Sequence, residues 1–170
     1  MASHKELCRL SATDAVALLR RGQVSPIELV DAAAARIEEV EPQVNALPIR
    51  FLDAARDAAK HFPPPGAEPD RPGWLAGLPI AVKDYNDVGG QLTTFGSPIF
   101  ADNVAAADDI TVATMRASGG IPIAKSNVPE FAGAHTFNSV WGATRNPWNL
   151  GRSAGGSSGG AAAALAAGEV

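Results

Sequence analysis

The glycine-serine run at residues 155–160 (Gly-Gly-Ser-Ser-Gly-Gly) places the hydroxyls of Ser157 and Ser158 among four glycines. Glycine adopts backbone conformations that other residues avoid, so hydroxyls and amides in such a run can converge on one point. A flexible linker has a similar composition. However, the small residues at 161–167 predict a helix, and the N-terminus of a helix suits an anionic ligand or intermediate. The run therefore indicates a site for chemistry.

A phosphate site is an alternative use of such a run, but neither of its two common contexts is present. A P-loop ends in Gly-Lys-Ser or Gly-Lys-Thr, whereas this run continues as Gly159-Gly160-Ala161. A dinucleotide-binding fingerprint follows a strand, whereas Asn-Pro-Trp-Asn at 146–149 is typical of a turn. Binding of a phosphate or nucleotide at this loop therefore stays only as a third hypothesis.

Lys83 is the candidate base, because it ends the apolar run at 78–83. Lysine is normally protonated at neutral pH, but burial at the end of a strand disfavours the charged form. A neutral lysine can take a proton from a serine. Asp84 is adjacent, yet successive side chains on a strand point to opposite faces, so Asp84 need not neutralise Lys83. A lysine that extends from a strand end into solvent is the alternative interpretation.

Histidine offers the other familiar base for a serine nucleophile. His4 lies in the N-terminal segment and His61 adjoins a run of prolines, so only His135 is near the other candidates. A surface histidine without a catalytic role is the competing interpretation of His135. Cys8 is the only cysteine, which excludes an internal disulfide and a thiolate metal cluster. We expect no metal and no organic cofactor.

Composition and charge narrow the class of protein. The chain of 170 residues is 46% hydrophobic and 19% charged, which is typical of one globular domain. Its net charge is −4, and no cluster of Lys and Arg offers a surface for nucleic acid or an anionic membrane. The polar N-terminus does not resemble a signal peptide, and no apolar run is long enough to span a membrane. We therefore expect a cytoplasmic protein that binds neither nucleic acid nor membrane.

The elements that must position these residues fall into two parts. The first part, 1–62, reads as a helical lead-in, with three predicted helices. They are a helix opened by a capping box of Ser11 and Asp14, a helix opened by Ser25-Pro26-Ile27-Glu28 and stopped by Pro42, and a weaker one at 51–61. A connection rich in Pro and Gly follows at 63–76 and should hold no regular element.

The second part, 77–170, reads as the start of an α/β layer. Buried strands are predicted at 78–83 and 121–124, and a helix capped by Asp108 or Asp109 lies between them. A strand, a helix and a strand of this length predict a crossover and a partly parallel sheet. The sequence therefore predicts one α/β domain in which Lys83 ends a strand and the serines precede a helix.

Four segments, in order along the chain, resemble conserved blocks of the amidase-signature family. They are 77–84 (Gly-Leu-Pro-Ile-Ala-Val-Lys-Asp), 125–131 (Lys-Ser-Asn-Val-Pro-Glu-Phe), 142–149 and 155–160. The helix that begins at Ser25-Pro26 is also similar to the family pattern. The resemblance covers almost the whole chain, and it implies the N-terminal part of the family's fold: a helical lead-in, then part of a mixed β-sheet covered by helices.

The resemblance also implies roles for individual residues. The family hydrolyses amide bonds with a Ser–cis-Ser–Lys triad, in which Lys83 would be the base and Ser157 the bridging serine after a cis peptide bond. Ser158, Gly155 and Gly156 would support this network. Phe131 and Ala132 fall where the family lines its substrate pocket.

Two departures from the family pattern affect these expectations. The family nucleophile lies roughly two dozen residues beyond the bridging serine, in an Asp-x-Gly-Gly-Ser loop that also donates the oxyanion-hole amides. In this sequence that loop would lie past Val170. An oxyanion-hole donor alone is worth about 3–4 kcal/mol, so the 170-residue chain is expected to be inactive by itself. We interpret it as a single incomplete amidase domain, with its sheet edge beside Lys83 lacking a partner. Ser153-Ala154 replaces the usual Thr-Pro, which affects only the stiffness of the loop.

The resemblance leaves several functions open. The first is an amidase whose longer parent chain hydrolyses a small-molecule amide through an acyl-enzyme, with a homodimer of the parent left open. The second is an inactive remnant or binding module that keeps the fold. Within the family, one component of a glutamyl-tRNA(Gln) amidotransferase is a further alternative. Nothing in the sequence points to a tRNA-bound partner, so we favour a general amidase.

Overall fold

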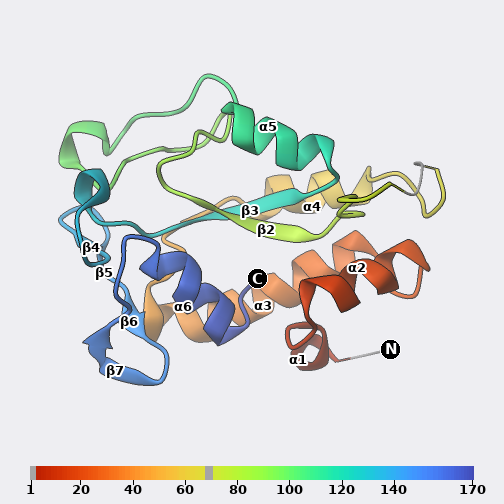
Figure 1. The fold of residues 1–170 in the computed structure, drawn as a ribbon, viewed down its shortest axis with the longest axis horizontal. Coiled ribbons are helices and arrows are strands. Elements are labelled where there is room, and N and C mark those ends of the chain that lie inside the picture. The colour runs from red at the N-terminus through yellow and green to blue at the C-terminus, as the bar shows by residue number, and fades with distance from the viewer. Residues whose placement is uncertain (1–2, 68–70) are drawn as a thin grey trace.

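The computed structural model describes residues 3–67 and 71–170 and has helices on both sides of a small sheet (Figure 1). Part of the Pro/Gly connection, residues 68–70 with Pro69, lies outside the described residues. The α-helices are α1 His4–Leu7, α2 Ala12–Arg20, α3 Pro26–Val44, α4 Leu52–Lys60, α5 Ile110–Ala117 and α6 Gly159–Ala167. Two 3-10 turns are η1 Pro98–Phe100 and η2 Glu130–Ala132. The strands are β1 Ile49–Arg50, β2 Pro79–Lys83, β3 Ile121–Ser126, β4 Phe137–Asn138, β5 Gly142–Ala143, β6 Arg145–Asn146 and β7 Asn149–Ser153.

The helix starts follow the capping residues, with one correction. Ser25 and Glu28 form the expected capping box of α3, in which each side chain bonds the other residue's backbone N–H. At α2, the Ser11 hydroxyl accepts from the backbone N–H of Asp14, but the Asp14 carboxylate accepts from the Ser11 hydroxyl instead of reaching back to the backbone. Aspartate is one methylene shorter than glutamate, so the reciprocal half of the box is lost.

We expect Ser25→Ala to lower the free energy of unfolding by about 1 kcal/mol, since the first turn of α3 loses its side-chain acceptor. Urea denaturation followed by circular dichroism measures the change. Ser25→Asp keeps an acceptor at the same position and should retain most of the stability. Equal losses in the two variants would contradict a capping role.

Helix α3 runs past the proline that was expected to stop it. Pro42 lies inside the helix, which ends only at Val44, and Asn45 closes it in the left-handed conformation with φ 55°. The Asn45 side chain also donates to the carbonyl oxygen of Trp141, at 2.7 Å. Packing and this distant contact hold the last turn of α3, a tertiary effect that overrides the local cost of proline.

The three-stranded sheet has the order β1-β3-β2, with β3 in the centre. Strands β2 and β3 are parallel and joined through α5, as predicted, and Lys83 pairs with Ser126 in register. The antiparallel strand β1 lies within the expected helical lead-in and was not predicted, because two residues carry no periodic pattern.

Strand β2 is less buried than predicted. Only Val82 is buried, whereas all of β3 is buried. The reason is its position: among the described residues β2 has a strand on one side alone, so it forms an edge of the sheet.

The two faces of the sheet meet different helices. Helix α5 covers one face, where Val82 packs with Val88 and Val112, and α3 and α6 lie on the other (Figure 1). The larger core, on the α3 and α6 side, is built from small aliphatic residues of α3, α4, β3 and α6. Since side chains alternate along β2, Lys83 lies on the α6 face and Asp84 on the α5 face. No helix in the described part of the chain is long and apolar enough to cross a membrane.

Candidate active site

The structure brings Lys83 and the serine pair together. Lys83 Nζ lies 3.0 Å from Ser157 Oγ and 2.8 Å from Ser158 Oγ, although 74 and 75 residues separate them in the sequence. Lys83 ends β2, and the serines directly precede α6, which packs on the same face of the sheet. The Lys83 side chain is half-buried, not fully buried as expected, because β2 is an edge strand.

The loop that carries the serines is fixed by backbone contacts on both sides. The peptide bond between Gly156 and Ser157 is cis, as the resemblance implies. The carbonyl oxygen of Gly155 accepts from the backbone N–H of Thr136 at 2.7 Å, and the Thr136 hydroxyl accepts from the N–H of Gly159 at 2.9 Å. Thr136 is fully buried, so the loop is anchored to the segment before β4 and is not a free linker.

Two of the glycines are required because the backbone approaches its neighbours closely. A Cβ atom at Gly156 would lie 2.2 Å from the carbonyl oxygen of Ala134. A Cβ atom at Gly160 would lie 2.5 Å from both the backbone nitrogen and the backbone oxygen of Asn127. A larger residue at Gly156 must push the loop away from the segment before β4, and one at Gly160 must push the start of α6 away from the backbone that follows β3. Either change displaces the backbone next to the two serines.

We therefore expect Gly160→Ala to lower the free energy of unfolding by about 2 kcal/mol, because its methyl group meets rigid backbone. Chemical denaturation of the purified chain measures this. Ala162→Gly is a control in the same helix at an exposed position, and it should cost at most about 1 kcal/mol through helix propensity. A Gly160→Ala variant as stable as the unmodified chain would refute the close packing.

Helix α6 begins two residues earlier than predicted, at Gly159, with Ser158 as its N-cap. The Ser158 side chain makes no cap hydrogen bond within the helix, and its hydroxyl contacts Lys83 instead. The N-terminal end of α6 is therefore aimed at the Lys83 site, where the helix dipole favours negative charge.

A second lysine, which the sequence interpretation missed, lies on the opposite face of the sheet. Lys125 and Asp84 are both fully buried and form an ion pair, with Nζ 3.0 Å from Oδ1. Thr93 accepts from Lys125, and Thr94 donates to Asp84 through its backbone N–H and its hydroxyl. Burial lowers the pKa of Lys125, and the Asp84 carboxylate opposes that shift.

Asp84 is therefore neutralised by Lys125, and it points away from Lys83 as the alternation of the strand predicts. The sequence feature that could have pointed to Lys125 is its position at the end of the apolar run 121–124. The pairing with Asp84 depends on the register of β2 and β3, which no local pattern contains.

Phe131 and Ala132, the predicted pocket residues, lie on η2 and are exposed. Both have left-handed backbones, with φ 44° and 65°. Tyr85, which was not predicted, connects this turn to Lys83. Its hydroxyl donates to the carbonyl oxygen of Pro129 and accepts from the backbone N–H of Ala132, and Lys83 Nζ lies 5.0 Å from the centre of its ring.

The histidines show no bond to the serine pair. His135 is exposed, and its Nδ1 lies 3.4 Å from Ser153 Oγ. His61 Nδ1 contacts the carbonyl oxygen of Asp57. Within residues 3–67 and 71–170, Lys83 is thus the basic side chain that contacts Ser157.

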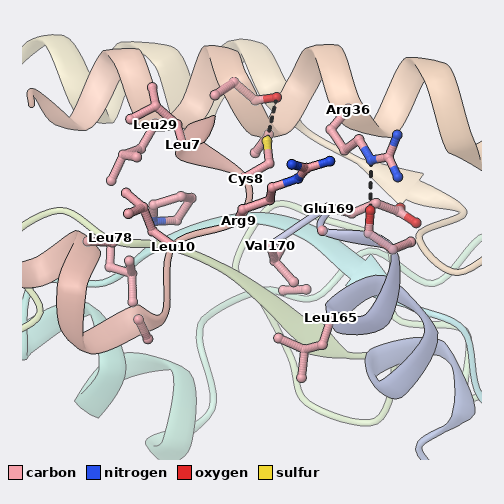
Figure 2. Close-up of a pocket in the computed structure, with 18 of the residues that line it drawn as sticks. Leu7, Cys8, Arg9, Leu10, Leu29, Arg36, Leu78, Leu165, Glu169 and Val170 are labelled. Atoms are coloured by element: carbon pink, nitrogen blue, oxygen red, sulfur yellow. Dashed lines mark hydrogen bonds between the residues drawn. The ribbon is translucent and has the colours of Figure 1, made fainter. Parts of the chain in front are cut away.

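A large groove lies along the free edge of β2 (Figure 2). Its volume is about 910 Å³, and α1, α3, β2 and α6 contribute mostly apolar lining. Leu165 of α6, two-thirds exposed at 66%, and Val170 lie in its wall (Figure 2). The expectation that the sheet edge beside Lys83 has no partner therefore holds for the described residues.

The chain is similar to known amidases over nearly its whole length. The Amidase family profile matches residues 28–170. The glutamyl-tRNA(Gln) amidotransferase A-type subunit from Roseiflexus sp. (strain RS-1) is 43% identical over 96% of this chain and 34% of its own. An acylamidase from Rhodococcus erythropolis is 42% identical over 94% of this chain and 34% of its own. The chain thus spans about a third of the length of these relatives.

Solved structures agree with the sequence comparison. The structure of a 6-aminohexanoate cyclic dimer hydrolase superposes with a TM-score of 0.84 and 36% identity, over 96% of this chain and 32% of that one. The predicted fold class is confirmed, since this neighbour has the same arrangement of helices and sheet. The family profile and the identities above establish that the chain belongs to the amidase-signature family.

Proposed function

We propose that residues 1–170 supply the lysine and the bridging serine of an amidase, which hydrolyses a carboxylic amide through an acyl-enzyme. The contact of Lys83 Nζ with Ser157 Oγ, at 3.0 Å, carries this proposal. A base must lie within about 2.6–3.2 Å of the proton that it takes, and this distance meets that requirement. The nucleophilic serine would come from the part of the amidase that these residues do not include.

The proposed proton path runs through the two serines in sequence. The nucleophilic serine gives its proton to Ser157 Oγ while Ser157 gives its own proton to the Lys83 amine. The serine oxygen then bonds to the amide carbon, and the proton held by Lys83 returns through Ser157 to the leaving nitrogen as the C–N bond breaks. Water, deprotonated along the same path, attacks the acyl ester. Its proton returns through Ser157 to the serine oxygen as the ester C–O bond breaks, which releases the carboxylic acid. Ser158, which also contacts Lys83, would keep the amino group aimed at Ser157.

A small-molecule amide in the cytoplasm is the proposed substrate, without a metal or organic cofactor, and a homodimer of the whole enzyme is left open. The similarity to the Rhodococcus acylamidase favours this choice. A component of an amidotransferase is the second candidate, supported by the 43% identity to the Roseiflexus protein. Glutamine-dependent ammonia release that requires partner proteins would identify the second candidate.

A chimera tests the proposal. Residues 1–170 replace the matching third of the Rhodococcus acylamidase, and hydrolysis of 4-nitroacetanilide is followed by absorbance. We expect an active chimera in which Lys83→Met lowers kcat by about 10²–10⁴-fold, the usual contribution of a catalytic base. Lys60→Met, at an exposed position on α4, is the matched control and should change little.

Two results would contradict the proposal. The first is an active chimera in which Lys83→Met or Ser157→Ala keeps full activity, since the base or its bridge would then lie elsewhere. The second is a chimera that folds, as judged by circular dichroism, but does not hydrolyse amides. That outcome would favour the inactive remnant.

A further inference from the structure

Tyr85 lies between Lys83, the base of the proposed function, and the turn of Phe131 and Ala132, the predicted pocket residues. It follows β2 two residues after Lys83, in a turn, and it is half-buried. Its ring faces Lys83, with Nζ 5.0 Å from the ring centre. Its hydroxyl reaches the turn at Phe131–Ala132 on η2. One side chain therefore contacts the base and the turn beside it.

The hydroxyl of Tyr85 holds a backbone conformation that its residues do not prefer. Phe131 and Ala132 have φ of 44° and 65°, where residues other than glycine are uncommon and must be held by their surroundings. Tyr85 accepts from the Ala132 N–H and donates to the Pro129 carbonyl oxygen, so it bridges both ends of this turn. These two hydrogen bonds help to hold the turn in its left-handed conformation.

The ring of Tyr85 suits the charge that Lys83 acquires during the proposed reaction. A lysine ammonium within about 6 Å of an aromatic ring centre is attracted to the face of the ring. When Lys83 takes the proton from Ser157, it becomes such a cation. The ring therefore attracts the ammonium that forms and keeps the amino group on the side of the serines.

Other aromatic rings hold Tyr85 in this position. Phe95 stacks on it with ring centres 6.3 Å apart, Phe100 packs edge-on against Phe95 at 5.2 Å, and Phe131 against Phe100 at 6.1 Å. The chain has ten aromatic residues in all, and four of the ten form this row, which begins at Tyr85 next to Lys83. Phe131, at the end of this row, is 56% exposed.

We propose that Tyr85 is a positioning residue of the amidase site, which holds the Lys83 amino group with its ring and the Phe131–Ala132 turn with its hydroxyl. This inference rests on the proposed function. The alternative is that Tyr85 only fills space in the aromatic row. The two cases differ, because a space-filling ring makes no use of the hydroxyl.

NMR of the labelled 170-residue chain tests each half separately. Tyr85→Phe keeps the ring, so the ring-current shift of the Lys83 methylene protons next to Nζ should remain. The Ala132 amide should exchange with solvent at least about tenfold faster, since its acceptor is lost. Tyr85→Leu should lose the ring-current shift as well. Phe100→Leu, in the same aromatic row, is the matched control and should keep the Lys83 shift.

Activity of the chimera gives the functional readout. We expect Tyr85→Leu to lower kcat by about 10–100-fold, the cost of a displaced catalytic group, while Tyr85→Phe mainly raises KM. An unchanged Ala132 exchange rate in Tyr85→Phe, or an unchanged Lys83 shift in Tyr85→Leu, would overturn the proposal. If the chimera is inactive, the proposed function fails, and the NMR results still decide whether Tyr85 holds the lysine and the turn.

Discussion

Replacing Lys125 by methionine is expected to lower the free energy of unfolding by about 3–5 kcal/mol, because it leaves Asp84 as an unpaired buried charge. Both side chains are fully buried, and Lys125 Nζ lies 3.0 Å from Asp84 Oδ1. Methionine matches the length of lysine, so little of the loss should come from an empty cavity. The change should also disturb Thr93, which accepts from Lys125.

Equilibrium denaturation in urea measures this effect, and a second variant separates charge from packing. Adding Asp84→Asn to Lys125→Met removes both charges, so the double variant should regain much of the lost stability. Lys60→Met is the control for an exposed lysine, and its effect should stay within about 0.5 kcal/mol. A Lys125→Met variant that loses less than about 1 kcal/mol would show that the buried pair does not hold the sheet.

The two lysines have different surroundings because they lie on opposite faces of the sheet. Lys83 and Lys125 lie on neighbouring strands but on opposite faces, because their positions in the register differ by one residue: Lys83 pairs with Ser126, and Lys125 with Val82. On the α5 face, Lys125 neutralises Asp84. On the α6 face, Lys83 has only hydroxyls and the Tyr85 ring among its polar and aromatic contacts in the described residues. The Asp84 carboxylate is therefore kept from pairing with Lys83.

Local patterns were enough to predict much of this arrangement. The apolar runs before Lys83 and at 121–124 predicted β2 and β3, and the helix between them predicted their parallel pairing. The glycine-serine run marked the loop before α6. These features are contained in short stretches of sequence, where alternation, capping and glycine content act directly.

The features that were missed depend on contacts between distant residues. Strand β1 exists because its backbone pairs with β3, and α3 continues past Pro42 because Asn45 and the packing around it hold the last turn. Tyr85 follows a strand in a position with no local signal, and its role depends on a turn 44 or more residues later. These contacts depend on the register of the strands and on the paths of the loops, and local propensity predicts neither.

The buried carboxyl group of Glu169 should make the free energy of unfolding fall as the pH rises. Its side chain is fully buried, and neither carboxylate oxygen has a hydrogen-bond donor in the described part of the chain. Burial, and then the neighbouring carboxylate of Glu41, raise its pKa from 4.5 to about 9, while Arg36 and Arg50 oppose the shift. Two ionised carboxylates carry no proton that could form a hydrogen bond between them. Glu169 can therefore donate to Glu41 only when it is protonated.

The sign of the effect follows from the proton count. Between about pH 4.5 and pH 9 the folded chain keeps the Glu169 proton and the unfolded chain releases it, so unfolding becomes more favourable as the pH rises. The contribution is fully present below pH 4.5 and is lost as the pH rises through 9. Each pH unit is worth about 1.4 kcal/mol for one group, so roughly 3–4 kcal/mol should be lost between about pH 5 and pH 8.

Glu169→Gln isolates this group, because glutamine donates to Glu41 as the protonated acid does and does not titrate. The variant should match the unmodified chain near pH 5 and exceed its stability at pH 8 by roughly 3 kcal/mol, measured by urea denaturation across that range. Glu38→Gln, which removes an exposed carboxylate on α3, is the matched control and should leave the slope unchanged. Equal pH slopes in Glu169→Gln and the unmodified chain would mean that Glu169 is charged in the folded state. The charge on Glu169 would then have to be balanced by Arg36 or Arg50, since these are the cations that act on it.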